Sequence, residues 1–427
     1  MTVAEKTIKM KIDSPAMAAT SEETRNRALK KVKEALIENK EIIFKANAED
    51  LKAAEEEGVG QAVKKRLKFD ENKLAAVTEG IEQLIGLKDP IGRTLLKREL
   101  DEGLVLTRIS VPIGVIGVIF EARPDALVQI SSLCIKSGNC AVLKGGRETA
   151  RTNKVLFDII HEAAKEAHLP ENCLFQVEAH SQIDELLSCD KSVDLLIPRG
   201  SNAFVRYIMN NTKIPVMGHA DGVCHVYIDK SADIDKAIKI IVDAKTQYTA
   251  ACNAAETLLV HEGIAEEFLK KAAVKLSDAG VKLRGNSRVS QIIECEKMED
   301  DEYKTEYLDL VLSVKIVADE NEAITHINTF GSHHTDAIVT EDDEAAEIFM
   351  QMVDSAGVYR NCSTRFADGF RYGFGAEVGI STSKLHARGP VGLDGLVTYK
   401  YRLCGNGHIV GDYASGAKQF NFKDIDA

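Results

Sequence analysis

Apolar residues recur at helical spacing in the amino-terminal part of the chain. Ala28, Leu29, Val32 and Leu36 stand among Lys and Glu residues, a period of about 3.6 residues that is typical of amphipathic helices. No proline interrupts residues 21–88, so this region is predicted to be helical. A polar turn then leads into alternating apolar residues over 99–109, which predicts a β-hairpin.

From Val115 the pattern changes to short apolar runs separated by helical segments. The predicted strands are Val115–Phe120, Cys140–Leu143, Leu174–Val177 and Val193–Ile197. The predicted helices between them are Ala126–Lys136, Thr149–Ala167 and Ser181–Leu187. Strands that are apolar throughout and alternate with helices indicate a parallel sheet covered on both faces. The spacing suits a dinucleotide-binding unit.

A second alternating set follows the apolar run Val226–Ile228 and predicts a second α/β domain. Its expected helices are Ile234–Ala244 and Ile264–Leu276, and its expected strands are Thr257–Val260, Val314–Val317 and Ala337–Val339. Residues 281–310 show no clear hydrophobic period. The run of charged residues 294–302 is most simply interpreted as a solvated loop or helix. Near the carboxyl end, Leu396–Leu403 alternates apolar and polar residues, which predicts a strand with one buried face.

Size and charge narrow the class of protein. A chain of 427 residues is expected to form two or three packed units. The net charge of −12 argues against a surface for nucleic acid or anionic membranes. No apolar run approaches the roughly 20 residues of a membrane span, and the amino end lacks a signal-peptide pattern. A cytoplasmic enzyme is therefore expected. The nine cysteines show neither zinc-ligand spacing nor a disulfide framework.

One cysteine stands out as a candidate nucleophile. Most free cysteines are small buried hydrophobes, and Cys140, Cys173 and Cys224 fit that pattern because they lie in or beside apolar strands. Cys252 instead lies in a run of small residues ahead of a predicted strand. A ligand can approach the backbone closely there, and a backbone N–H could bind an oxyanion.

Two strand–turn–helix junctions are candidate phosphate sites. Lys144-Gly145-Gly146-Arg147 follows a predicted strand, and glycines at such a turn let backbone amides face a phosphate. Arg199-Gly200-Ser201 follows another predicted strand. Neither matches the GxGxxG or P-loop spacing, so a plain connection is an equally good interpretation of each.

Several blocks, taken together and in order, resemble the gamma-glutamyl phosphate reductase family, a branch of the aldehyde dehydrogenase superfamily. The resemblance extends from about Ser21 to about His408. The blocks are Ile113–Asp125, Leu196–Ser201, Gly218–Tyr227, Cys252–Val260 and Asn361–Phe366.

The resemblance implies an aldehyde dehydrogenase-like α/β fold in three parts. Residues 1–95 and 111–228 would form a cofactor-binding domain around a parallel sheet, and 229–385 an α/β catalytic domain. Residues 96–110 and 386–427 would form a β-hairpin oligomerisation element and tail, so a homo-oligomer is expected.

The implied reaction is NADPH-dependent reduction of L-glutamyl 5-phosphate to L-glutamate 5-semialdehyde and phosphate, the second step of proline biosynthesis. Cys252 would carry the thioester. The fused plant and animal enzyme has a kinase half that is absent here, so a separate glutamate 5-kinase is expected to supply the substrate. The pattern of residues alone does not distinguish NADPH from NADH.

Family positions imply further site residues. For the cofactor they are Lys144 on the ribose side, Gly200 and Ser201 near the pyrophosphate, and Glu306 at the nicotinamide ribose. Lys144 and Arg147 are two cations at one strand–turn–helix junction, a suitable place for a 2′-phosphate. The alignment also puts His219 near the nucleophile. The substrate phosphate is a dianion and is expected to need a cation near Cys252, for which the candidates are Arg123, Arg199 and Arg365. Ser363 and Thr364 are candidates for hydrogen bonds to the amino-acid end.

Two positions depart from oxidative aldehyde dehydrogenases. Ala122 falls where those enzymes carry an Asn that donates to the oxyanion, and His219 falls where they carry the general-base Glu. A reductase of acyl phosphates has no need of the water that this Glu activates. The alternatives are an oxidative aldehyde dehydrogenase, which phosphate dependence would separate, and a non-catalytic scaffold, which failure of Cys252 to react with alkylating agents would favour.

Overall fold

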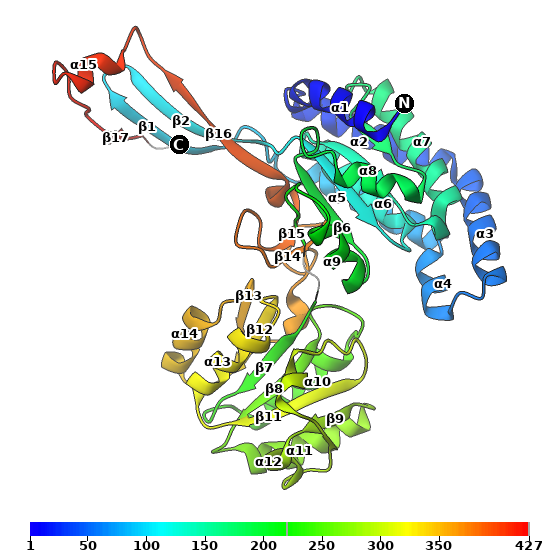
Figure 1. Ribbon diagram of the computed structural model, residues 1–427, viewed down its shortest axis with the longest axis vertical. Coiled ribbons are helices and arrows are strands. Elements are labelled where there is room, and N and C mark those ends of the chain that lie inside the picture. Colours follow the sequence, from blue (N-terminus) through cyan, green and yellow to red (C-terminus); the bar gives the residue numbers. More distant parts are fainter. Residues whose placement is uncertain (219–220, 426–427) are drawn as a thin grey trace. The chain divides into compact units, whose positions relative to one another are not determined.

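The computed structural model describes residues 1–218 and 221–425, apart from the side chains of residues 62 and 180. The chain forms two compact units, which can be followed in Figure 1. The first unit comprises Met1–Met217, Phe374–Gly379 and Val391–Ala427, and the second comprises Gly218–Gly373 and Ile380–Pro390. In the described part of the chain, no helix has both the length and the apolar character needed to cross a membrane.

The predicted amino-terminal helical region is confirmed. Ser21 caps α2 by accepting a hydrogen bond from Thr24 N at 3.1 Å. A further helix, α1, precedes this region; it begins with a capping box between Thr2 and Glu5. The five helices are α1 (Val3–Ala18), α2 (Glu22–Glu38), α3 (Lys40–Glu56), α4 (Gln61–Leu67) and α5 (Glu71–Gly86).

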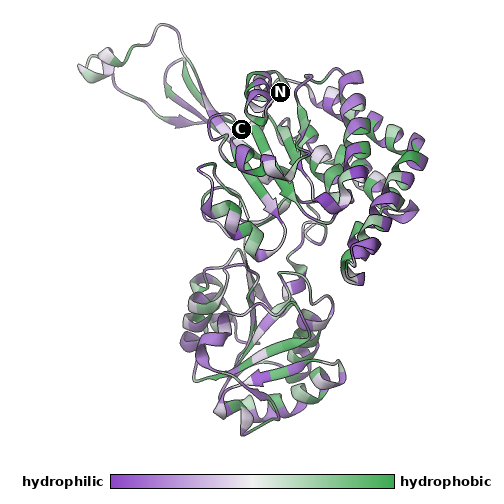
Figure 2. Cartoon of the chain, turned by 45° about the vertical axis from the view of Figure 1, so that its right-hand side comes forward, coloured by the Kyte–Doolittle hydropathy of each residue, from purple (hydrophilic) through white to green (hydrophobic). Residues whose placement is uncertain are grey.

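The first unit is built around a four-stranded parallel sheet, as predicted, in the order β5-β4-β3-β6. Every residue of β3 and β4 is buried, and Figure 2 shows these strands as hydrophobic segments among helices with hydrophilic outer faces. The elements are β3 (Val115–Phe120), α6 (Pro124–Lys136), β4 (Cys140–Lys144), α7 (Ala150–Glu166), β5 (Leu174–Gln176), α8 (Ile183–Leu187), β6 (Leu195–Arg199) and α9 (Asn202–Asn210).

The strand order of this sheet reverses direction at β3. The chain steps outward from β3 to β4 and β5, then returns to the other side of β3 to form β6. Ligands of open α/β sheets bind where the strand order reverses, at the carboxyl ends of the strands. This switch point lies between Phe120 at the end of β3 and Arg199 at the end of β6.

The predicted hairpin is also present in the first unit, as β1 (Thr94–Asp101) and β2 (Leu104–Pro112). The strand β16 (Val397–Cys404) pairs antiparallel with β2 along its whole length, and β17 (Lys423–Asp424) lies on the other edge of β1. A short helix, α15 (Val410–Ala414), links these last two strands.

The expectation that Leu396–Leu403 has one buried face is wrong for the single chain. Of β16, only Val397 is buried, whereas Tyr399, Tyr401 and Leu403 are 51%, 56% and 56% exposed. The strand is held through its edge by hydrogen bonds to β2, and within the described residues no second layer packs on it.

The second unit contains a seven-stranded parallel sheet in the order β10-β9-β11-β8-β7-β12-β13. Its strands are β7 (Cys224–Ile228), β8 (Ala255–His261), β9 (Lys282–Gly285), β10 (Glu296–Lys297), β11 (Val311–Val317), β12 (Thr335–Val339) and β13 (Gly357–Arg360). Its helices are α10 (Ile234–Thr246), α11 (Ala265–Asp278), α12 (Ser287–Ser290), α13 (Glu320–Phe330) and α14 (Asp343–Met352). Two short strands, β14 (Gly379–Ser381) and β15 (Gly389–Val391), form a separate sheet.

The predicted second α/β set is therefore present, with one difference at its start. The strand β7 pairs with β8 and β12 inside the second sheet, although residue 228 was the expected end of the cofactor-binding domain. The unreadable region 281–310 contains short elements, β9, α12 and β10, which are too brief to establish a period.

Candidate active site

Cys252 lies in the second unit, in the loop between α10 and β8, and this loop is fixed by its neighbours. The Cys224 thiol lies 3.3 Å from the Cys252 carbonyl oxygen. The Thr364 hydroxyl donates to the Asn253 carbonyl at 2.7 Å, and Asn253 Nδ2 donates to the Ala367 carbonyl at 2.8 Å. Bonds from β7 and from the segment after β13 therefore hold the backbone of Cys252 and Asn253 in place.

A glycine lies directly against the same loop. A Cβ atom at Gly222 would come within 2.2 Å of the Cys252 carbonyl oxygen and 2.5 Å of its Cα. Only glycine allows the two backbones to approach so closely. Gly222 thus fixes how far the half-buried Cys252 stands from the amino end of β7.

A histidine that was not foreseen from the sequence contacts the sulfur. His334 Nε2 lies 3.2 Å from Cys252 Sγ, and His334 Nδ1 lies 2.9 Å from Thr335 Oγ1. The amino ends of parallel strands meet at one edge of a sheet, and here β8 and β12 flank β7. Residues that precede these two strands are therefore brought together by a strand order that the sequence pattern alone does not give.

The backbone of the nucleophile loop can bind an oxyanion. Within residues 1–218 and 221–425, the Cys252 N–H has no hydrogen-bond acceptor. An N–H beside a nucleophilic sulfur is suitably placed for the negative oxygen of a tetrahedral adduct. The oxyanion role expected from the sequence stays a prediction.

Arg365 is the one of the three candidate arginines that belongs to the second unit with Cys252. Its side chain is buried, and Nε donates to Gln247 Oε1 at 2.9 Å. Burial and the charge of Arg371 lower the pKa of Arg365, whereas the charge of the nearby Cys252 thiolate raises it. A guanidinium stays protonated in proteins, so a positive charge lies close to the sulfur.

Ser363 and Thr364 hold local structure around Arg365. Ser363 Oγ accepts a hydrogen bond from Arg365 N at 3.3 Å, and the Thr364 hydroxyl is used on the Asn253 carbonyl. Both side chains are buried. Their expected contact with the amino-acid end of a substrate stays a prediction.

A buried ion pair closes the base of the nucleophile loop. Lys245 at the end of α10 and Glu256 at the start of β8 are fully buried, with Nζ and Oε2 2.6 Å apart. Burial raises the pKa of Glu256 to about 7, against the lowering by Lys245, and the charge of Glu306 raises it further. Glu256 Oε1 also accepts from Leu308 N at 3.3 Å. The pair therefore connects the Cys252 loop to the segment that carries Glu306.

The remaining predicted cofactor residues lie in the first unit, around the switch point. Ser201 N donates to Glu121 Oε2 at 3.0 Å, and Glu121 N donates to the Arg199 carbonyl at 3.0 Å. A Cβ at Gly200 would come within 2.4 Å of Glu121 Oε2. The ends of β3 and β6 thus meet closely at the amino end of α9, where backbone N–H groups favour an anion.

Lys144 and Arg147 differ in their surroundings. Lys144 is 2% exposed, its Nζ donates to the Gly145 carbonyl, and burial lowers its pKa while Glu148 raises it. Arg147 is exposed. Glu148 Oε1 accepts from Ala122 N at 2.5 Å. Of the two predicted cations, Arg147 is therefore the accessible one.

This cluster fits a dinucleotide phosphate, with one condition. It offers the Ser201 N–H, the Ala122 N–H and cationic side chains. In this structure both N–H groups donate to carboxylates, those of Glu121 and Glu148. A phosphate can use the same donors only when the carboxylates turn away.

Two other predicted residues have different surroundings. Arg123 Nη2 lies 3.4 Å from Asp125 Oδ2, a carboxylate that also binds Lys73 at 3.0 Å. Arg123 and Arg199 both lie in the first unit. His219 lies outside the described residues.

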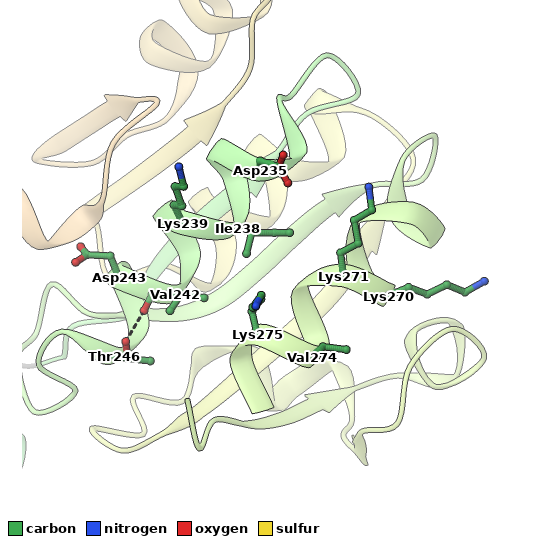
Figure 3. Close-up of a pocket in the computed structure, with 10 residues that line it drawn as sticks. All are labelled: Asp235, Ile238, Lys239, Val242, Asp243, Thr246, Lys270, Lys271, Val274 and Lys275. Carbon is green, nitrogen blue, oxygen red and sulfur yellow. Dashed lines mark hydrogen bonds between the residues drawn. The ribbon is translucent and has the colours of Figure 1, made fainter. Parts of the chain in front are cut away.

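A surface groove of the second unit, between α10 and α11, is not part of this site. Figure 3 shows its apolar floor of Ile238, Val242 and Val274 and the lysines around it. It contains neither cysteine nor histidine among its lining residues. The reactive side chains of the second unit gather instead around Cys252.

Comparison with known proteins agrees with this arrangement. The model of the aldehyde dehydrogenase family matches residues 3–302. Gamma-glutamyl phosphate reductase from Acetivibrio thermocellus is 57% identical over 98% of this chain and 97% of its own length. Gamma-glutamyl phosphate reductase 1 from Synechocystis is 55% identical over 94% of this chain and 93% of its own length.

Solved structures give the same result. The crystal structure of gamma-glutamyl phosphate reductase from Thermotoga maritima superposes with a TM-score of 0.93 at 39% identity, covering 95% of this chain and 99% of that one. An acetylating aldehyde dehydrogenase from Geobacillus thermoglucosidasius, 18% identical, shares the fold with a TM-score of 0.65 over 95% of this chain and 96% of its own. The chain is a member of the gamma-glutamyl phosphate reductase family, within the aldehyde dehydrogenases.

Proposed function

We propose that this chain reduces L-glutamyl 5-phosphate to L-glutamate 5-semialdehyde and phosphate, with NADPH, through a thioester on Cys252. The relatives that carry the name gamma-glutamyl phosphate reductase support the reaction. The observation that carries the proposal is Cys252 itself, held in a fixed loop with a buried arginine and a histidine beside it. The reaction would be the second step of proline biosynthesis, in the cytoplasm, downstream of a kinase that phosphorylates glutamate.

The residues around Cys252 account for formation of the thioester. The sulfur attacks the acyl carbon, the Cys252 N–H donates to the oxygen that becomes negative, and phosphate leaves. Arg365 lies close enough to act electrostatically on Cys252, so it can attract the phosphate dianion of the substrate. This makes Arg365 the first choice among the three candidate arginines.

The family uses a nicotinamide dinucleotide, and the switch point of the first unit is the site we assign to it. Gly200 and Ser201 would hold the pyrophosphate, and Lys144 and Arg147 the ribose side with its 2′-phosphate. Glu306 would hold the nicotinamide ribose. When bound, NADPH supplies the hydride that reduces the thioester to the aldehyde.

A reductase must protect its thioester from water. A Glu that orients water is the usual cause of thioester hydrolysis in oxidative relatives, and the family resemblance puts His219 rather than a Glu at that position. The thioester is therefore expected to pass its acyl group to phosphate in the reverse direction.

The reverse reaction tests the proposal. Purified protein, NADP and glutamate semialdehyde should form NADPH only when phosphate or arsenate is added, and a Cys252→Ala variant should form none. Steady NADPH formation in buffer without either anion would show that water reaches the thioester. That result would favour an oxidative aldehyde dehydrogenase and contradict the proposed function.

A further inference from the structure

The imidazole of His334 is placed to exchange a proton with the proposed nucleophile. Nε2 lies 3.2 Å from Cys252 Sγ, and the ring is 1% exposed. Nδ1 lies 2.9 Å from Thr335 Oγ1. If the Nδ1 proton is donated to this hydroxyl, the lone pair of Nε2 faces the sulfur. In that tautomer Nε2 can accept a proton from the thiol.

Three other histidines of the second unit have different surroundings. His225 Nδ1 lies 2.9 Å from Asp336 Oδ1, and His333 Nδ1 lies 2.6 Å from the Asp354 carbonyl. Burial, together with His225 and Lys315, lowers the pKa of His326 to about 2, so that ring stays neutral. Of the histidines in residues 1–218 and 221–425, His334 is the one in contact with Cys252 Sγ.

We propose that His334 takes the thiol proton of Cys252 and then gives it to the departing phosphate, a role that rests on the proposed acyl-phosphate chemistry. The S–H bond breaks, Nε2 takes the proton, and the thiolate forms a C–S bond to the acyl carbon. The bond between the acyl carbon and the bridging oxygen of the phosphate then breaks, and its electron pair stays on that oxygen. The proton moves from Nε2 to the same oxygen. Sulfur, nitrogen and phosphorus keep their oxidation states. After reduction of the thioester, solvent returns a proton to the released thiolate.

Geometry allows one nitrogen to serve both partners. In the tetrahedral adduct the leaving oxygen is two bonds from the sulfur, so an imidazole that reaches one atom is also near the other. His334 and Arg365 both lie close to Cys252, so an imidazolium would be repelled by the buried guanidinium. Prompt transfer of the proton to phosphate removes that unfavourable charge. Asp336, two residues from His334 along the chain, bonds His225 and Ser355.

The first experiment measures the thiolate without substrate. Alkylation of Cys252 by iodoacetamide at pH 7, followed by peptide mass spectrometry, should slow by about tenfold or more in His334→Gln, because the amide cannot accept the proton. The matched control is His333→Asn, whose residue has a φ of 60° that asparagine tolerates; it should react as fast as the wild type. Wild-type reactivity in His334→Gln, or equal slowing in the control, would overturn the proposal.

A second variant covers a failure of His334→Gln to fold, which its melting temperature would reveal. Thr335→Val has the same shape but no acceptor for the Nδ1 proton, so alkylation should slow several-fold. An unchanged rate would count against the assigned tautomer and hence against the proton transfer. Neither measurement depends on reductase activity, so the histidine's role and the proposed function can fail separately.

The third experiment varies the leaving group to distinguish the two proposed steps, in which His334 takes the thiol proton and then gives it to the phosphate. Acetyl phosphate and p-nitrophenyl acetate deliver the same acyl group to Cys252, but only the phosphate gains from a proton as it leaves. His334→Gln should therefore slow acetylation by acetyl phosphate at least about tenfold more than acetylation by the ester. Equal slowing with both donors would overturn proton delivery to the phosphate.

Discussion

Lys245 Nζ and Glu256 Oε2 lie 2.6 Å apart with both side chains fully buried, one at each end of the loop that carries Cys252. Burial lowers the pKa of Lys245 and raises that of Glu256, while each partner's charge opposes these changes. The pair therefore resists separation although both charges are costly to bury. It fixes the width of the loop base and, through Leu308 N, the position of the neighbouring segment.

Replacing one partner of this ion pair should lower the free energy of unfolding more than replacing both partners. Lys245→Met should lower the free energy of unfolding by about 3–5 kcal/mol, because the buried Glu256 carboxylate is left uncompensated. The double variant Lys245→Met/Glu256→Met should recover most of that loss. Urea titration of the wild type and these two variants measures the recovery, and a double variant no more stable than Lys245→Met would contradict the prediction.

Stability should also depend on pH through Glu256. Its pKa is raised in the folded protein from the ordinary 4.5 to about 7, so the folded state holds the proton more tightly than the unfolded state. The stabilisation is full below about pH 4.5 and is lost as the pH rises through about 7. The double variant should lack this decline. Urea titrations between pH 4.5 and 8 compare the two slopes, and equal slopes would refute the assignment.

Cys252→Ala should abolish turnover without unfolding the protein, because Cys252 makes the covalent bond and is only half-buried. The control is Cys404→Ser, whose cysteine is exposed on β16, and it should retain wild-type activity. The forward assay with each variant decides. Activity of Cys252→Ala within about tenfold of the wild type would remove Cys252 from the mechanism.

The choice of cofactor should depend on two neighbours of opposite charge. Arg147→Ala should raise the KM for NADPH more than the KM for NADH, since the accessible cation faces the expected 2′-phosphate. Glu148→Gln should lower the KM for NADPH, because its carboxylate competes for the Ala122 N–H. Lys144→Ala should act in the same direction as Arg147→Ala. Equal effects on both cofactors would contradict the site.

The uncovered strand β16 should pair subunits. Tyr399 and Tyr401 lie on one face of it, 5.7 Å apart between ring centroids, and more than half of each is exposed. We expect a dimer or larger assembly, and Tyr399→Asp/Tyr401→Asp should shift it toward the monomer. The control is Lys400→Ala, on the other face of the strand. Light scattering at micromolar concentration measures the mass; a wild-type monomer would refute the prediction.

Much of the fold follows from local pattern. Strands such as Val115–Phe120 and helices such as Ile234–Ala244 have a clear period, and the structure contains them within a few residues. The exposure of β16 could not be predicted from its sequence. Alternation of apolar and polar residues shows that a strand has an apolar face, but not whether the same chain covers that face. The boundary near residue 228 was displaced because an apolar strand shows no preference for one sheet over another.

The active site could be predicted from the sequence less completely than the fold. Cys252 stands out by its small neighbours, but His334 reaches it only through strand order, which no local pattern states. Lys245 and Glu256 lie directly outside the predicted helix and strand that flank the Cys252 loop, and charged residues at such places are usually solvated. Their burial depends on packing between α10 and β8. Family position named Thr364, whereas the structure shows its hydroxyl holding the Asn253 carbonyl.

The pairing of β2 with β16 has a consequence for synthesis of the protein. The ribosome makes β2 early, but its partner emerges only after the whole second unit. The second unit takes nearly all its residues from one stretch of chain, so it can fold as soon as that stretch is available. One edge of β2 meanwhile stays unpaired and open to other strands. The nascent hairpin therefore exposes an unpaired strand edge until β16 has been synthesised.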